Sequence, residues 1–142
     1  MKKVNILLVI LAIAVVAVSC ETYDDYNTDR KTVVGFITPT KNLNSIPEGG
    51  SKTDSVSLFV SDISSSPRTF TVTTVPVDTL PTAPENFTYD STVTFPANTR
   101  EAKIGVTAID VTIDDTRRFF QLAIEGEGNV VSGGRSLIGV RN

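Results

Sequence analysis

Cys20 is the only cysteine of the chain, and it stands where its thiol could do chemistry. It follows the apolar run of residues 6–18 almost directly, and acidic residues come next along the chain. The chain has no histidine, so the commonest general base and transition-metal ligand is absent. The apolar run before Cys20 and the acidic segment after it therefore have to indicate the chemistry of its thiol.

A short basic start and a short apolar run precede the cysteine. The run has about 13 residues, whereas a membrane-spanning helix needs roughly 20. A basic start, a short apolar run and the small residues Ala17 and Ser19 are typical of a secretory signal peptide. We therefore expect residues 1–19 to be a signal-peptide helix.

The residues around Cys20 resemble the lipobox of bacterial lipoproteins. In those proteins the cysteine thiol takes a diacylglycerol and becomes the first residue after cleavage. Ala17 stands where relatives usually carry Leu. The resemblance implies lipidation of Cys20 and a membrane anchor without a transmembrane span. The alternative is a plain cleaved signal, or an uncleaved anchor, with an unmodified cysteine.

The acids that follow, Glu21, Asp24 and Asp25, are similar to a surface-export signal of some Gram-negative lipoproteins. The alternative is a solvated tether, as most charge runs are. Residues 20–31 show no apolar periodicity, so we expect a lipidated cysteine followed by a flexible acidic tether. The predicted location is the outer membrane, with the domain on the cell surface.

Composition excludes several classes of function. The chain has 13 basic and 16 acidic residues, a formal net charge of −3, which argues against a nucleic-acid partner. It has no Gly-x-Ser-x-Gly elbow and no phosphate-binding glycine loop. Two carboxylates could hydrolyse a glycoside, but nothing in the sequence indicates a cleft or a raised pKa. We therefore predict a protein that is not an enzyme.

Residues 32–142 are typical of one all-β domain. Short alternating runs of Val, Ile, Thr and Phe between turn residues predict seven strands, at residues 32–38, 55–61, 69–75, 91–95, 102–109, 118–124 and 136–141. One apolar face per strand needs a second sheet to cover it, so we predict a single seven-stranded immunoglobulin-like β-sandwich. The long connections, where binding usually occurs, are residues 39–54, 76–90 and 126–134.

Four motifs resemble the Calx-β domain, an immunoglobulin-like sandwich. They are IPEGGS (46–51), TAPENF (82–87), STVTFPANTREAKIGV (91–106) and DVTIDDTRRFFQLAI (110–124). The resemblance spans most of the domain. Its most specific element is the turn of residues 95–99, in which Asn98 can take the left-handed conformation that relatives often give to Gly.

Some Calx-β domains bind calcium through loop acids at one end of the sandwich. The resemblance implies calcium ligands at Glu48, Asp110, Asp114 and Asp115. The sequence departs from the family pattern twice, because Asn86 replaces an Asp and Arg117 and Arg118 stand where relatives carry more acids. Calcium is usually coordinated by about six to eight oxygen atoms. We therefore favour a turn with solvated and paired charges and no cofactor, and calcium stays as an alternative.

Phe87 and Tyr89 are the candidates for a ligand-binding loop. Sugar sites usually rely on flat aromatic platforms, and this chain has no Trp. The alternative is that the two rings pack a loop onto the edge of the sandwich. Small lipoproteins with one immunoglobulin-like domain often accompany glycan-uptake systems, and this analogy implies a glycan-binding accessory protein.

Three short Asp-Ser or Asp-Thr motifs look like O-glycosylation sites of some surface bacteria, with acceptors Ser55, Thr79 and Ser91. A chain rich in Ser and Thr also produces such matches by chance. Together these observations predict a non-catalytic cell-envelope lipoprotein that acts as a binding or structural module. Its partners would be the membrane, through Cys20, and an unidentified protein or polysaccharide.

Overall fold

The computed structural model describes residues 30–142, of which Lys31–Asn142 form one compact unit. Its elements are β1 (Thr32–Phe36), β2 (Thr40–Leu43), β3 (Ser51–Val60), β4 (Arg68–Val75), the 3-10 turn η1 (Pro84–Asn86), β5 (Phe87–Tyr89), β6 (Thr92–Phe95), β7 (Glu101–Ile109), β8 (Arg118–Ile124), β9 (Val130–Ser132) and β10 (Ser136–Val140). The predicted signal peptide, Cys20 and most of the tether lie outside the described residues. Within those residues, no helix is long and apolar enough to span a membrane.

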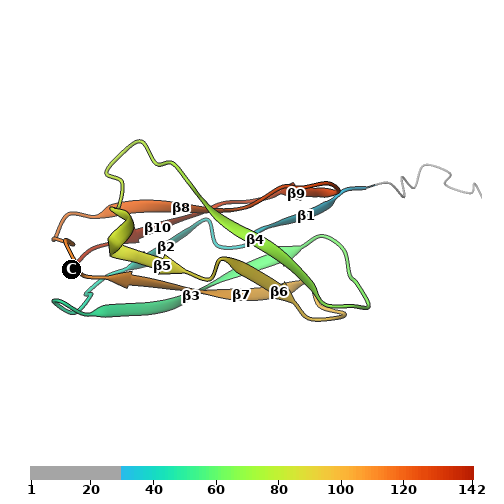
Figure 1. Cartoon of the computed structure of the whole chain (residues 1–142), viewed down its shortest axis with the longest axis horizontal. Helices are drawn as coiled ribbons and strands as arrows, with labels where there is room; N and C mark the ends of the chain where they lie inside the picture. The colour runs from blue at the N-terminus through green and yellow to red at the C-terminus, as the bar shows by residue number, and fades with distance from the viewer. Residues whose placement is uncertain (1–29) are drawn as a thin grey trace, which may run out of the picture. The chain divides into compact units, whose positions relative to one another are not determined.

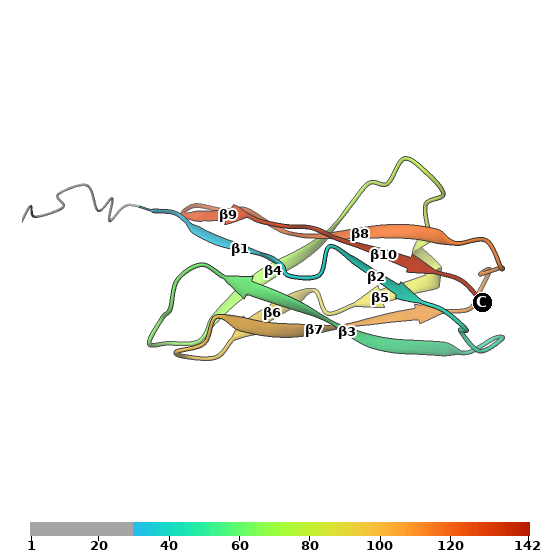
Figure 2. The same cartoon turned by 180° about the vertical axis from the view of Figure 1, so that it is seen from behind.

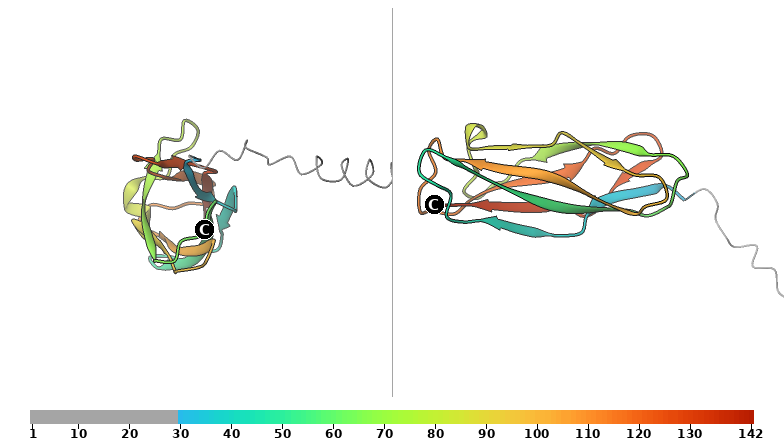
Figure 3. Two further views of the ribbon diagram at one scale, coloured as in Figure 1. Left: turned by 90° about the vertical axis from the view of Figure 1, so that its right-hand side faces the viewer. Right: turned by 90° about the horizontal axis from the view of Figure 1, so that it is seen from below.

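The strands form two five-stranded sheets that face each other as a sandwich (Figure 1, Figure 3). The strand orders are β5-β7-β3-β1-β9 and β2-β10-β8-β4-β6. The prediction of an all-β sandwich is confirmed, but the prediction of seven strands is wrong, because the described domain has ten. The additional strands β2, β5 and β9 lie in the connections that the sequence predicted as loops.

The three additional strands form because they pair with neighbouring strands, and not because their own residues show a strand pattern. β2 pairs in parallel with β10, β9 pairs in parallel with β1, and β5 pairs with the end of β7. Each has only three or four residues, too few to show an alternating apolar pattern. β3 likewise begins at Ser51 and not at Ser55, since its first residues pair with β7 but are exposed.

The chain crosses from one sheet to the other twice, between β1 and β2 and between β9 and β10. Glycines permit the crossing. β1 and β9 belong to one sheet, whereas β2 and β10 belong to the other. At the crossing, a Cβ on Gly35 would lie 2.5 Å from the backbone nitrogen of Gly134. Because no side chain fits there, the close approach of the two strands requires glycine.

The core lies between the sheets and contains the predicted apolar faces. The largest fully buried side chains are Phe95, Leu43, Leu58, Ile104, Leu122, Ile124, Ile138, Val34, Val56, Val60, Val93 and Val106. The alternation predicted for β3 and β7 is therefore present. β8 departs from it, because Ala123 on its opposite face is also buried.

The turn of residues 95–99 has the predicted geometry. Asn98 has φ of 61°, the left-handed conformation that the sequence indicated. Its backbone N–H donates to the carbonyl of Ser64 at 2.8 Å, which joins this turn to the β3–β4 loop. The Thr99 hydroxyl donates to the Pro96 carbonyl at 2.9 Å and closes the turn.

The domain has two distinct ends (Figure 1, Figure 2). The chain enters β1 at the end that carries β9 and the β3–β4 and β6–β7 loops. The opposite end, called here the far end, carries loop 44–50, loop 110–117 and the C-terminus. The candidate calcium ligands all come from the two loops of the far end.

Candidate functional site

Glu48 and Asp110 meet at the far end. Both line an open hollow of about 610 Å³, together with Ile46, Gly49, Val111, Ile113 and Asn142. The Gly49 backbone N–H donates to Oδ2 of Asp110 at 2.9 Å, so this carboxylate ties one loop to the other. Among the described residues, no three acidic, His or Cys side chains lie close enough together to hold a metal ion.

The other two candidate ligands lie further along loop 110–117. Oδ1 of Asp114 accepts a hydrogen bond from the Thr116 backbone N–H at 2.9 Å, and Oδ2 lies 3.5 Å from Nη2 of Arg118. The Thr116 N–H, and then the charge of Arg118, hold the pKa of Asp114 below its usual value despite some desolvation. Asp115 is exposed. Among residues 30–142, Arg117 forms no ion pair with an acid, and it donates instead to Oδ1 of Asn44 at 3.0 Å.

Asn86 holds loop 110–117 against η1. Its side chain is 1% exposed. Its Oδ1 accepts hydrogen bonds from the backbone N–H groups of Val111 at 3.2 Å and Thr112 at 2.9 Å. Its Nδ2 donates to the Thr112 hydroxyl at 2.8 Å. The residue that departs from the family pattern thus has a structural role, which the sequence alone did not indicate.

Phe87 and Tyr89 lie on one face of the edge strand β5 and pack against the core. Their rings are stacked at a centroid distance of 6.4 Å, and the Phe87 ring stacks on Phe120 at 3.9 Å. Both side chains are half-buried. Phe87 also lines an apolar hollow of about 280 Å³ under loop 76–82, and Phe119 and Pro81 contribute to the same wall.

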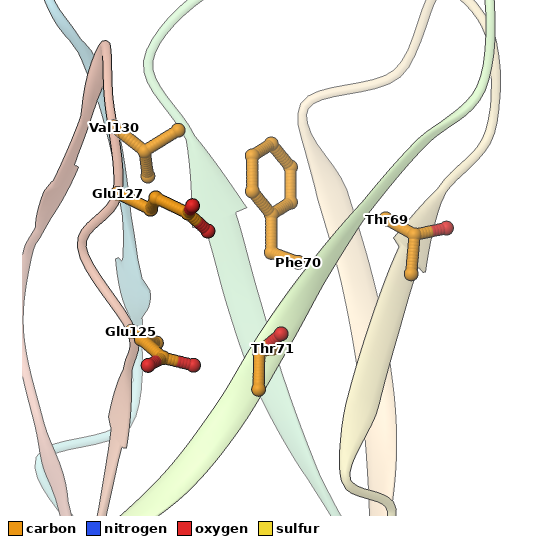
Figure 4. A pocket seen from close by; sticks show the side chains of 6 residues that line it. All are labelled: Thr69, Phe70, Thr71, Glu125, Glu127 and Val130. Atoms are coloured by element: carbon orange, nitrogen blue, oxygen red, sulfur yellow. The ribbon is translucent and has the colours of Figure 1, made fainter.

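A further hollow, called here the Phe70 hollow, lies between β4 and the connection from β8 to β9 (Figure 4). It has a volume of about 250 Å³ and is lined by Thr69, Phe70, Thr71, Glu125, Glu127 and Val130. The sequence analysis missed it, because the aromatic ring and the two acids are far apart in the chain. No spacing rule connects them, since only the pairing of β4 with β8 brings them together.

The three candidate O-glycosylation acceptors are all exposed but lie in different settings. Ser55 is in the middle of β3, where it pairs with Gly105 of β7. Thr79 is in the long connection between β4 and η1, and Ser91 lies between β5 and β6. Thr79 and Ser91 therefore both lie outside the strands, although the Ser91 carbonyl accepts a hydrogen bond from the Val72 N–H of β4 at 2.8 Å.

Two further ion pairs lie at the surface of the sandwich. Nζ of Lys41 on β2 lies 2.6 Å from Oδ2 of Asp54 on β3, which joins the two sheets. The Lys41 hydrogen bond lowers the pKa of Asp54. Arg68 lies 2.9 Å from Oδ2 of Asp62. Desolvation raises the pKa of Asp62, but the hydrogen bond and charge of Arg68 lower it more, and the net shift is downward.

Solved structures share this fold. A candidate carbohydrate-binding protein from Bacteroides ovatus matches with a TM-score of 0.62 and 11% identity, over 77% of this chain and 36% of that chain. A second Bacteroides ovatus protein, of unknown function, matches with a TM-score of 0.59 and 16% identity, over 76% and 46%. The apo form of the Calx CBD1 domain matches with a TM-score of 0.59 and 13% identity, over 79% and 97%.

These likenesses show the fold, which is a Calx-β-like β-sandwich. No protein-family model and no curated protein matches the sequence. The chain spans less than half the length of the two Bacteroides proteins, but nearly the whole of the Calx domain. A shared fold does not by itself fix a function.

Proposed function

We propose that the chain is a non-catalytic lipoprotein of the outer membrane, displayed on the cell surface, whose sandwich binds an extracellular protein or polysaccharide. The observation that carries this proposal is the place where the chain enters the domain. β1 begins at one end, so the flanks and the far end stay free when the chain is anchored upstream. A flexible segment of residues 21–31 would span roughly 18 Å on average and at most about 36 Å.

Three carboxyl groups of the domain are unsuited to the role of a general acid. A general acid in a glycoside hydrolase needs a raised pKa. The carboxyl pKa values of Asp54, Asp62 and Asp114 are all shifted downward by donors and cations. The shared fold with a candidate carbohydrate-binding protein favours a polysaccharide as the ligand.

The experiment for this proposal measures two properties separately, the lipidation of the chain and its exposure on the cell surface. The full chain is produced in a Gram-negative host fed with an alkyne-labelled fatty acid, and intact cells are then treated with a protease. We expect a labelled chain that the protease removes. Cys20→Ala should abolish the label, whereas Ser19→Ala, which keeps a small residue before the cysteine, should retain it. An unlabelled wild-type chain would refute lipidation, and a labelled chain that resists the protease would refute surface display.

Calcium binding is the second candidate function, because Glu48 and Asp110 line the same hollow. Thermal unfolding of the full chain is measured in millimolar calcium and then with chelator. A ligand at 100 times its dissociation constant stabilises by about 2.7 kcal/mol, which raises the melting temperature by several degrees. A rise that Glu48→Gln and Asp110→Asn abolish would establish the site, and an unchanged melting temperature would exclude it.

A further inference from the structure

The Phe70 hollow contains a rigid aromatic platform. The Phe70 ring packs against the core and meets the ring of Phe95 edge-on, with a centroid distance of 5.7 Å and an interplanar angle of 77°. Figure 4 shows Phe70 standing opposite Glu127 and Val130 across the hollow. An aromatic ring that the core already holds in place loses little conformational entropy when a ligand stacks on it.

Two glutamates complete the hollow, and backbone hydrogen bonds fix the main chain of both. The Glu125 backbone N–H donates to the Thr71 carbonyl at 3.0 Å, and the Glu127 carbonyl accepts from the Val130 N–H at 2.9 Å. Both side chains are exposed. Within residues 30–142 neither glutamate forms an ion pair, whereas Asp54, Asp62 and Asp114 each do. Glu125 and Glu127 are therefore free to accept hydrogen bonds from a ligand.

The combination of groups fits a sugar ring. The C–H face of a pyranose stacks on an aromatic ring, and its hydroxyl groups donate to carboxylates in charge-assisted hydrogen bonds. The Thr71 side chain, which also lines the hollow, adds a hydroxyl group. A volume of about 250 Å³ is small for a drug-sized ligand but suits one sugar unit of a longer chain.

The two carboxylates select among sugars, and Arg68 disfavours a cation at the Phe70 ring. Two carboxylates repel uronic acids, so a neutral sugar is preferred. A lysine or ammonium ligand would seek the Phe70 ring, but the guanidinium of Arg68 already lies 5.9 Å from its centroid. A second cation at the ring would be repelled by Arg68.

We propose that the Phe70 hollow is a subsite for a neutral pyranose unit of an extracellular polysaccharide. Phe70 stacks on the sugar ring, and Glu125 and Glu127 accept hydrogen bonds from its hydroxyl groups. This inference rests on the proposed function and names the ligand class and the site. Because the subsite is an open hollow between β4 and the connection from β8 to β9, a long glycan can pass beside it without meeting a closed cleft.

Isothermal titration calorimetry tests the inference on the full chain, kept soluble in a polyoxyethylene detergent that contains no sugar. The probes are hexasaccharides of glucose, mannose, galactose and xylose, with polygalacturonate and a lysine-rich peptide as charged probes. We expect at least one neutral hexasaccharide to bind. Glu125→Gln and Glu127→Gln should each weaken that binding about tenfold, since each removes a charge-assisted hydrogen bond. Phe70→Leu should weaken it at least as much.

Two variants control for general effects. Glu85→Gln and Glu101→Gln change exposed glutamates outside the hollow and should leave the affinity unchanged. The melting temperature of Phe70→Leu separates loss of binding from loss of folding, and the two glutamate variants carry the test if that variant unfolds. Sugar binding that the hollow variants do not alter would overturn the site. No binding by any neutral probe, or preferred binding of either charged probe, would overturn the ligand class. The labelling and protease experiment decides the proposed function separately.

Discussion

Replacing Asn86 by Ala should release loop 110–117 from the rest of the domain. The substitution removes a buried carboxamide that makes hydrogen bonds to the backbone N–H groups of Val111 and Thr112 and to the Thr112 hydroxyl. Each neutral hydrogen bond contributes about 0.5–1.5 kcal/mol net. Val111 is 58% exposed, so water can reach part of the freed backbone, and the loss should lie in the lower half of the summed range of about 1.5–4.5 kcal/mol.

We therefore expect the free energy of unfolding to fall by about 2–3 kcal/mol. For a domain of this size, that corresponds to a melting temperature lower by about 8–12 °C. The measurement is urea unfolding of the full chain, combined with amide hydrogen exchange in loop 110–117. Exchange at Val111 and Thr112 should accelerate, whereas exchange in β3 and β7 should change only with global stability.

Two further variants make the prediction sharper. Thr112→Val removes only the contact with Nδ2 and should cost about 0.5–1.5 kcal/mol. Asn129→Ala changes an exposed Asn in another loop and should cost less than about 0.5 kcal/mol. If Asn86→Ala lost no more than Asn129→Ala, and exchange at Thr112 stayed slow, Asn86 would not be the residue that holds the loop.

Three other expectations follow from the fold. Gly35→Ala should destabilise by about 1–3 kcal/mol or more in urea unfolding, because its Cβ would lie 2.5 Å from Gly134 N; a neutral result would mean that the crossing strands move apart readily. Asn98→Ala should cost about 1 kcal/mol at its φ of 61°, and Asn98→Gly should not. The pKa of Asp62 is lowered, so its stabilising contribution is present above its unfolded value of 3.8 and is lost as the pH falls further. Asp62→Asn should therefore flatten the acid limb of a stability–pH profile, and an unchanged limb would contradict this.

The sequence predicted the strands that contact the core on one face. Val56, Leu58 and Val60 alternate with half-buried or exposed residues because one side of β3 faces the other sheet. The same period marks β7. β2 and β9 could not be predicted in this way, since their pairing depends on the crossing at Gly35, a contact that involves residues far apart in the sequence.

The features of the loops and of the candidate site were likewise only partly predictable from the sequence. The conformation of Asn98 was predictable, because a left-handed turn residue is a local property of the chain. The role of Asn86 was not, since its partners Val111 and Thr112 lie in a distant loop and two of its contacts use backbone groups that carry no sequence signal. The Phe70 hollow depends on the same kind of long-range contact.

The contacts at the far end also bear on where a ligand would bind. Asp110 accepts the Gly49 N–H and Asp114 accepts the Thr116 N–H, so both carboxylates already hold loops in place. A cation at the far end would compete with these donors and with Arg118, which lies 3.5 Å from Asp114. Glu125 and Glu127 make no ion pair within the described domain and lie beside an aromatic ring that the core fixes. Asp110 and Asp114 at the far end therefore serve the structure of the domain, whereas Glu125 and Glu127 remain available for recognition.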